Sequence, residues 1–292
     1  MSASFALLPF RSVIALTGPD RVEFLQGLIS NDTTKVAADK AIWAALLTPQ
    51  GRFLNDMFVA DGGGDTLLLE TERERAAALA RKLSMYTLRS KVKVEDRAAS
   101  MEVAVVFGDE AEKALGIDKC ISYVDPRLPG LGVRVLAAAG EAAAILGSHG
   151  FTPAMTADYD ALRLSLGVPD GSRDLPPEKA LLLESGFDEL NGVDWKKGCY
   201  MGQELTARTK YRGLVKKRLF PVRLDGPLPA PGTLVERDGQ EVGEIRSGLG
   251  DRAMAMLRLD VLKQDGLKGD GLTAGGTRIL PEVPGWMKLP AD

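Results

Sequence analysis

One short segment of this chain has the composition of a reactive-thiol site. Cys199 stands between Gly198 and Gly202 in the sequence KGCYMGQE, which begins at Lys197 and ends at Glu204. A thiol attacks electrophiles or binds metal only as the thiolate, which neighbouring cations stabilise. Glycines let the backbone approach a ligand closely. The spacing therefore predicts a nucleophilic, redox-active or metal-binding sulfur at Cys199.

Positive charge is concentrated around this cysteine. Between Trp195 and Arg218 the chain has eight lysines and arginines and a single acid, so this stretch carries +7, whereas the whole chain carries −3 and the remainder therefore −10. A cationic segment on an acidic protein favours a local anion site. RNA contact is an alternative for residues 196–218, but few aromatic residues interleave the charges, which argues against nucleic-acid binding.

The other side chains capable of chemistry exclude several classes of protein. Two cysteines and one histidine, His149, are too few for a four-ligand zinc site or for a cluster held by four thiolates. No phosphate-binding glycine loop and no nucleophilic-serine motif is present. Cys120 is followed by Ile121 and is predicted to be structural. We expect no tightly bound metal, and a cluster would need ligands from a partner or a second copy.

The strands and helices that the sequence predicts, and that must position Cys199, indicate an α+β fold. Residues 41–98 contain a hairpin, a further strand and a helix capped by Thr71 and Glu74, and are predicted to form an α+β insertion. The other strands expected before Gly213 lie at 12–16, 101–107 and 131–137, and the helices begin at Pro19, span 141–146 and lie within 153–168.

After Gly213 short alternating runs replace the helical pattern. The Asp238-Gly239 pair is a strong hairpin-turn signal between two of these runs. The pattern predicts a small C-terminal all-β barrel or sandwich.

The sequence also predicts a compartment. No apolar run approaches the length of a membrane-spanning helix, and the N-terminus has neither a secretory nor a transit-peptide pattern. The two cysteines form no disulfide framework. A reducing, cytoplasmic location without membrane association is expected.

The KGCYMGQE segment resembles the signature of the YgfZ/GcvT family, in particular YgfZ and its mitochondrial iron–sulfur assembly relatives. The resemblance implies an aminomethyltransferase-like ring of three domains around a folate pocket. The domains would be a discontinuous folate-binding α+β domain (1–40 with 99–213), an inserted α+β domain (41–98) and a C-terminal β-barrel (214–292). The signature residues are Lys197, Gly198, Cys199, Tyr200, Gly202, Gln203 and Glu204, with Arg208 downstream, and the supporting segments are 24–27, 31–32, 47–52, 90–92, 125–129 and 211–213.

The resemblance also implies residue roles and a tetrahydrofolate ligand, or a one-carbon derivative of it. Cys199 is the key functional residue of the signature. Asp56 matches the catalytic carboxylate of the glycine-cleavage T-protein, and Glu70 stands where that protein has an asparagine. Tyr159 lies where this branch has an aromatic contact to the flat pterin. Arg208 is the best candidate for the anionic glutamate tail.

The sequence departs from the T-protein at two places. Ser165 replaces the glutamate of its RLEAG-like segment, and DPRLPGLG stands in place of its GYTGEDGFE loop. We therefore expect a tetrahydrofolate-binding factor for assembly or repair of iron–sulfur enzymes, with reduced folate, iron–sulfur assembly proteins and client enzymes as partners. The alternatives are a folate-dependent one-carbon transferase using Asp56 and an RNA-associated adaptor using residues 196–218.

Overall fold

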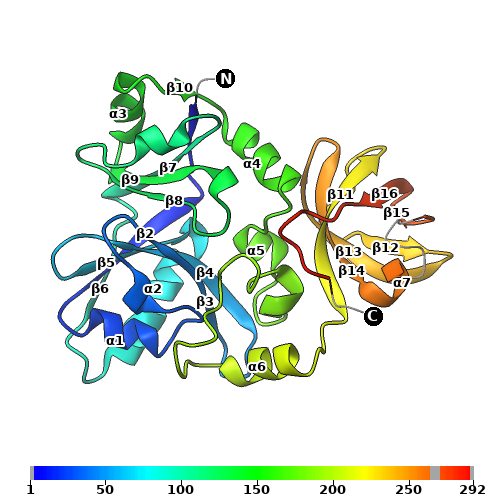
Figure 1. The fold of residues 1–292 in the computed structure, drawn as a ribbon, viewed down its shortest axis with the longest axis horizontal. Helices are drawn as coiled ribbons and strands as arrows, with labels where there is room; N and C mark the ends of the chain where they lie inside the picture. The colour runs from blue at the N-terminus through cyan, green and yellow to red at the C-terminus, as the bar shows by residue number, and fades with distance from the viewer. Residues whose placement is uncertain (1–2, 264–269, 290–292) are drawn as a thin grey trace. The chain divides into compact units, whose positions relative to one another are not determined.

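The computed structural model describes residues 3–263 and 270–289 (Figure 1). Chain contacts divide these residues into two compact units, each of which is discontinuous in sequence. No helix of the described residues is long and apolar enough to cross a membrane. The first unit holds residues up to Pro49, Leu54–Tyr159 and Leu190–Gln203, and the second holds Gln50–Phe53, Asp160–Glu189 and residues from Glu204 onward.

A five-stranded sheet with two helices forms one half of the first unit. Its strand order is β3-β4-β5-β2-β6, and β2 pairs antiparallel with both β5 and β6. Alternate residues of the strands, such as Ile14 and Leu16, pack against apolar residues of both helices, such as Leu25 and Leu79. The elements are β2 (Arg11–Thr17), β3 (Ile42–Leu47), β4 (Phe53–Asp61), β5 (Thr66–Glu72), β6 (Lys93–Asp96), α1 (Arg21–Gln26) and α2 (Arg73–Thr87).

The predicted capping box at the start of α2 is wrong. The cap position is Glu72, which makes no side-chain cap hydrogen bond, and Thr71 is still part of β5. The Thr71 hydroxyl instead donates to the carbonyl of Asp56 at 2.9 Å, so sheet pairing takes this residue away from the helix.

A second five-stranded sheet completes the first unit, with the order β10-β1-β7-β9-β8. Figure 1 shows its strands in blue and green, with α3 to one side of them. Its core is built from small and β-branched residues such as Val106, Val135 and Ala142. The elements are β1 (Ser4–Leu7), β7 (Met101–Phe107), β8 (Ile121–Val124), β9 (Val133–Ala138), β10 (Thr152–Pro153), α3 (Ala142–Ser148) and the 3-10 helices η1 (Thr33–Lys35), η2 (Ala111–Ala114) and η3 (Pro129–Leu131).

The second unit contains a closed six-stranded barrel, which confirms the predicted C-terminal β-barrel. The predicted hairpin turn joins β12 to β13, and both Asp238 (φ 52°) and Gly239 (φ 74°) have the positive φ that a type I′ turn requires. The barrel order is β11-β14-β13-β12-β15-β16. Its elements are β11 (Lys217–Asp225), β12 (Leu234–Arg237), β13 (Gln240–Leu249), β14 (Arg252–Arg258), α7 (Leu259–Lys263), β15 (Thr273–Ala274) and β16 (Thr277–Pro281).

Four helical segments precede the barrel strands: α4 (Thr156–Ser165), α5 (Gly171–Asp174), η4 (Leu182–Ser185) and α6 (Gln203–Tyr211). Buried Asp174, on α5, joins this helix to α4 and to barrel strand β13. It accepts a hydrogen bond from Arg163 of α4 at 3.0 Å and two from Ser247 of β13, at 3.0 and 2.6 Å. A buried carboxylate satisfied in this way holds the helices onto the barrel.

Candidate functional site

Residues 197–203, here called the signature loop, present Cys199 to solvent. The cysteine is exposed, and α6 begins at Gln203, the last residue of the loop. Gly198 (φ 91°) and Gly202 (φ 79°) both have the left-handed backbone that glycine adopts without strain. Apart from Gly198 and its two neighbours in the chain, no heavy atom of the described residues lies within 4 Å of the place where a β-carbon of Gly198 would stand. The two glycines therefore serve first to shape the loop around the thiol.

Lys197 fastens the signature loop to the end of α1. Its ammonium group donates to the carbonyl oxygens of Gln26, Ile29 and Asn31 at 2.7, 2.6 and 2.7 Å. All three donors of the ammonium are thereby used. Burial lowers the pKa of Lys197 to about 8, against the opposing attraction of Asp32 and Asp194. The sequence singled out this lysine as a neighbouring cation, whereas the structure makes it an anchor.

The segment around α1 makes further hydrogen bonds to the signature loop and to the residues before it. The side chain of Gln26 donates to the carbonyl of Lys197 at 3.3 Å, and the amide of Met201 donates to the carbonyl of Gly27 at 3.1 Å. Asn31 donates to the carbonyl of Asn191 at 2.7 Å. Two segments that are about 170 residues apart in sequence, 24–32 and 191–203, therefore hold each other in place.

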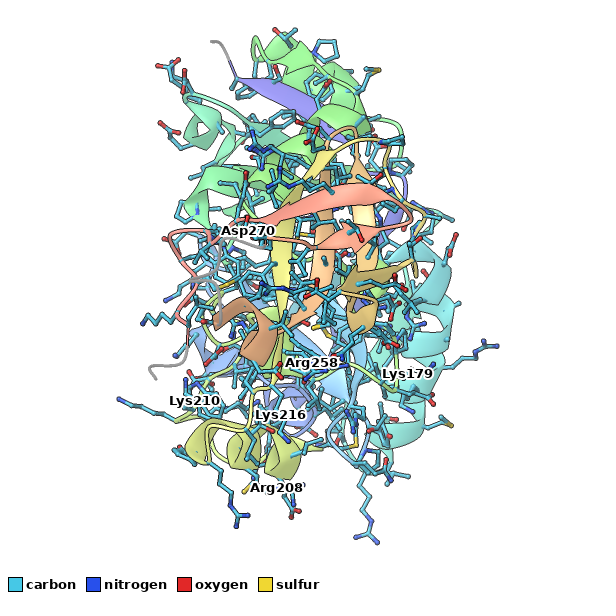
Figure 2. All side chains as sticks on the ribbon, turned by 90° about the vertical axis from the view of Figure 1, so that its right-hand side faces the viewer. Lys179, Arg208, Lys210, Lys216, Arg258 and Asp270 are labelled. Carbon is cyan, nitrogen blue, oxygen red and sulfur yellow. The ribbon has the colours of Figure 1, made fainter. Side chains whose placement is uncertain are left out.

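The remaining signature residues have distinct surroundings. Tyr200 is buried beneath the Lys197 ammonium, which lies 5.2 Å from its ring centroid, and its amide donates to Gln203 at 3.2 Å. Glu204 is exposed in the first turn of α6, where a negative charge favours the helix dipole. Arg208 is exposed on α6 (Figure 2).

A buried charge cluster lies in the same unit, centred on Glu70. This side chain is 0% exposed and accepts hydrogen bonds from Arg11 at 2.9 Å, from Tyr123 at 2.9 Å and from Arg134. Burial raises the pKa of the Glu70 carboxyl, but Arg134 and Arg11 outweigh this effect and lower it. Glu70 is thus an ionised carboxylate with both oxygens engaged.

Asp125 extends the cluster to the segment that follows β8. It is paired with Arg127 at 2.8 Å and with Arg134 at 3.1 Å. Burial raises the pKa of the Asp125 carboxyl, but the attraction and hydrogen bonds of Arg127, together with the attraction of Arg134, outweigh this effect and lower it. The guanidinium groups of Arg134 and Arg127 lie 4.0 and 4.8 Å from the ring centroid of Phe58 on β4. The cluster therefore joins the two sheets of the first unit.

Two buried polar atoms beside this cluster have no hydrogen-bond partner among the described residues. Asp56 is 2% exposed; one of its oxygens accepts a hydrogen bond from Trp43 at 3.0 Å, whereas the other accepts none among the described residues and forms a long ion pair with Arg11, at 4.0 Å. The hydroxyl of Tyr159, a residue 4% exposed, is also unpaired. Burial raises the pKa of Tyr159, which keeps the hydroxyl protonated. Such atoms mark places where a polar ligand gains hydrogen bonds.

The other cysteine has a different environment. Cys120 is half-buried and packs against the core of the second sheet. Burial, and to a smaller extent the nearby Glu141, raise the pKa of its thiol. Within residues 3–263 and 270–289, no group of three or more histidine, cysteine or acidic side chains could hold a metal ion. His149 is exposed.

The fold and its two halves match known protein families. Residues 10–152 match the family model of the GCVT N-terminal domain, and residues 216–289 match that of the CAF17 C-terminal β-barrel domain. The crystal structure of glycine cleavage system aminomethyltransferase T from Bartonella henselae superposes with a TM-score of 0.75, covering 96% of this chain and 84% of that chain at 16% identity. The chain therefore has an aminomethyltransferase-like fold with a CAF17-type C-terminal barrel.

Relatives of similar sequence show the family to which the chain belongs. The mitochondrial iron–sulfur cluster assembly factor IBA57 of Mus musculus is 37% identical, over 87% of this chain and 77% of that protein. The Homo sapiens factor is 36% identical with the same coverage, and the homologue of Phaeosphaeria nodorum is 32% identical over 89% of this chain and 71% of its own length. The chain belongs to the IBA57 family of iron–sulfur cluster assembly factors, which confirms the resemblance inferred from KGCYMGQE.

The comparison corrects one prediction. The cytoplasmic location expected from the sequence is contradicted, because the relatives are named as mitochondrial proteins. The expectation was based on missing signals and on cysteine usage, and a mitochondrial matrix is also a reducing compartment.

Proposed function

We propose that this protein acts in iron–sulfur cluster assembly through the thiol of Cys199. The proposal is supported by family membership and, above all, by the exposed cysteine on a loop that Lys197 anchors with three hydrogen bonds. A thiolate is a soft ligand that suits iron–sulfur clusters. An anchored loop holds such a ligand in one orientation at low entropic cost.

The number of cysteine thiolates in the chain limits how it could bind an iron–sulfur cluster. The chain has two cysteines, and Cys120 lies half-buried in another part of the first unit. One thiolate cannot complete the coordination of a cluster, which is usually bound by four. We infer that Cys199 works as a transient ligand, nucleophile or redox group together with a partner that supplies the remaining ligands.

A deletion strain tests the role in cluster assembly. Loss of the protein is expected to lower the activities of iron–sulfur enzymes, and expression of the chain is expected to restore them. Enzymes without a cluster, measured in the same extracts, serve as the control. Unchanged iron–sulfur activities in the deletion strain would remove the proposal.

A tetrahydrofolate site forms the second part of the proposal. The unpaired oxygen of Asp56 can accept a hydrogen bond from an N–H group, and the Tyr159 hydroxyl can donate or accept. Both atoms are buried, so a partner there would be worth more than one at the surface. A folate pterin has the N–H groups and the flat ring that suit such a site, and reduced folate supplies one-carbon units when bound.

The cluster around Glu70 would support this site indirectly. Both Glu70 oxygens are engaged with Arg11, Arg134 and Tyr123, so we propose that Glu70 positions Arg11 next to Asp56. The direct folate contacts predicted for Glu70 and Arg208 stay predictions. The free oxygen of Asp56 also keeps one-carbon transfer as a second candidate activity.

Folate binding gives a direct prediction. The purified protein is expected to bind tetrahydrofolate saturably in titration calorimetry, and Asp56→Asn to weaken binding by about tenfold or more, because a charged hydrogen bond contributes about 1.5–3 kcal/mol. Tyr159→Phe, which removes only the hydroxyl, is expected to have a smaller effect of about fivefold. The exposed Asp118→Asn is the matched control. Wild-type affinity in both site variants would argue against this site.

A further inference from the structure

The barrel has a groove whose role is not explained by the cysteine or by folate. The groove has a volume of about 870 Å³ and lies between the segment after α6, strand β13 and the end of β14. Val215, Val242 and Leu259 form its apolar part, and Lys216, Lys217 and Arg258 bring positive charge. Figure 2 faces this side of the barrel and shows Lys216 and Arg258 together.

The cations on this surface have few partners in the protein itself. Arg212 and Lys216 are exposed and make no ion pair with any residue of the described ranges. Half-buried Glu184 attracts Lys217, but burial outweighs this attraction and raises the pKa of the Glu184 carboxyl. This cationic surface belongs to a chain with a net charge of −3, so solvation of an acidic protein does not require it.

Apolar side chains adjoin the cations. Leu214 is 46% exposed, and Val215 next to it is half-buried against the core of the barrel. Tyr211 at the end of α6 is 78% exposed. An exposed apolar group beside unpaired charges is typical of a surface that binds another protein.

We propose that this groove docks an acidic segment of a partner protein that also carries aliphatic side chains. Lys216 and Lys217 would pair with the acidic residues, and Val215 in the groove, with exposed Leu214 next to it in the chain, would contact the aliphatic ones. Electrostatic complementarity of this kind sets the association rate and the choice of partner. The proposal goes beyond cluster assembly itself, which does not require an acidic partner.

The groove fits a polypeptide better than a nucleic acid. Glu241 and Asp260 lie in its lining, and Arg258 is held by Asp260 at 2.5 and 3.1 Å. Because Asp260 takes up the charge of Arg258, Lys216 and Lys217 are the cations of the described lining that remain to bind an anion. Two neighbouring lysines suit a short segment with one or two acidic side chains, whereas a phosphate backbone carries a charge at every nucleotide and would also meet Glu241. Tyr211 is a single exposed aromatic residue here, and sequence-tolerant RNA binding relies on several stacking rings.

Fluorescence anisotropy with a labelled synthetic peptide of glutamates and leucines tests the proposal. The full-length protein is expected to bind it saturably, and Lys216→Glu to weaken binding by about fivefold or more, with a further loss at higher salt. Arg223→Glu is the matched control. Arg223, on β11, is exposed like Lys216 but does not line the groove. A peptide with glutamine in place of glutamate is expected to bind more weakly.

Three outcomes would overturn the proposal. They are no saturable binding of the acidic peptide, an equal loss for Lys216→Glu and Arg223→Glu, and tighter binding of a labelled oligouridine that is itself lost in Lys216→Glu. The last would make this surface a nucleic-acid site. Because the assay uses no iron–sulfur enzyme, it can fail while the role in cluster assembly stands, and the reverse also holds.

Discussion

A Cys199→Ser variant is expected to fold like the wild-type protein and to fail to restore iron–sulfur enzyme activity in the deletion strain. Serine has almost the same size, and the side chain is exposed, so the loss of sulfur costs little stability. The hydroxyl does not ionise near neutral pH and is a poor ligand for iron in a cluster. Enzyme activities in extracts and thermal melting of the purified variant separate these effects. Full restoration by Cys199→Ser would make the cysteine dispensable.

Cys120→Ser is the matched control for this experiment. Cys120 packs against apolar residues, and its thiol has a raised pKa, so it is expected to react slowly with iodoacetamide at neutral pH. The variant is expected to restore activity fully and to lose about 1 kcal/mol of stability or less. Peptide mapping after alkylation should show modification first at Cys199. Faster labelling of Cys120 would contradict the assignment of the two thiols.

An Arg134→Met variant is expected to lose about 3–5 kcal/mol of unfolding free energy, the usual cost of removing one partner from a buried ion pair. Arg134 is shared by two buried carboxylates, Glu70 and Asp125, and both would stay in the interior with less positive charge. Urea denaturation at neutral pH measures the loss. Arg223→Met, an exposed substitution of the same kind, is expected to change stability by about 0.5 kcal/mol or less.

The pH dependence gives a second readout for the Arg134→Met variant. The pKa of Glu70 is lowered in the folded state, so its charge stabilises the protein above the ordinary value of 4.5, and this stability is lost as the pH falls below it. Without Arg134 the dependence should shrink or reverse, because burial then favours the protonated carboxyl. Adding Glu70→Gln to the variant is expected to recover part of the stability. A loss below about 1 kcal/mol with unchanged pH dependence would contradict a coupled cluster.

The sequence by itself determined the features that depend on neighbouring residues. Alternation of apolar and polar positions was enough to predict an all-β barrel or sandwich at the C-terminal end, and the family resemblance favoured the barrel. Asp238-Gly239 marked one of its hairpins because the required positive φ is a local property. The KGCYMGQE segment likewise indicated the family before any coordinates were known. The cysteine signal was local too, since composition and spacing carry it.

Only the tertiary structure decided how distant segments use their side chains. In the sequence Lys197 is one of several cations near Cys199. In the folded protein three carbonyl oxygens of residues 26–31 surround its ammonium group. The sequence suggests Glu70 as a ligand contact, yet one of its oxygens accepts from Arg11 and Arg134 and the other from Tyr123, all on other strands. The unpaired oxygen of Asp56 is equally invisible in sequence. For Lys197 and Glu70 the hydrogen-bond partners lie many residues away in the chain. The free energy of burying a polar group selects these contacts, and no local sequence pattern reports it.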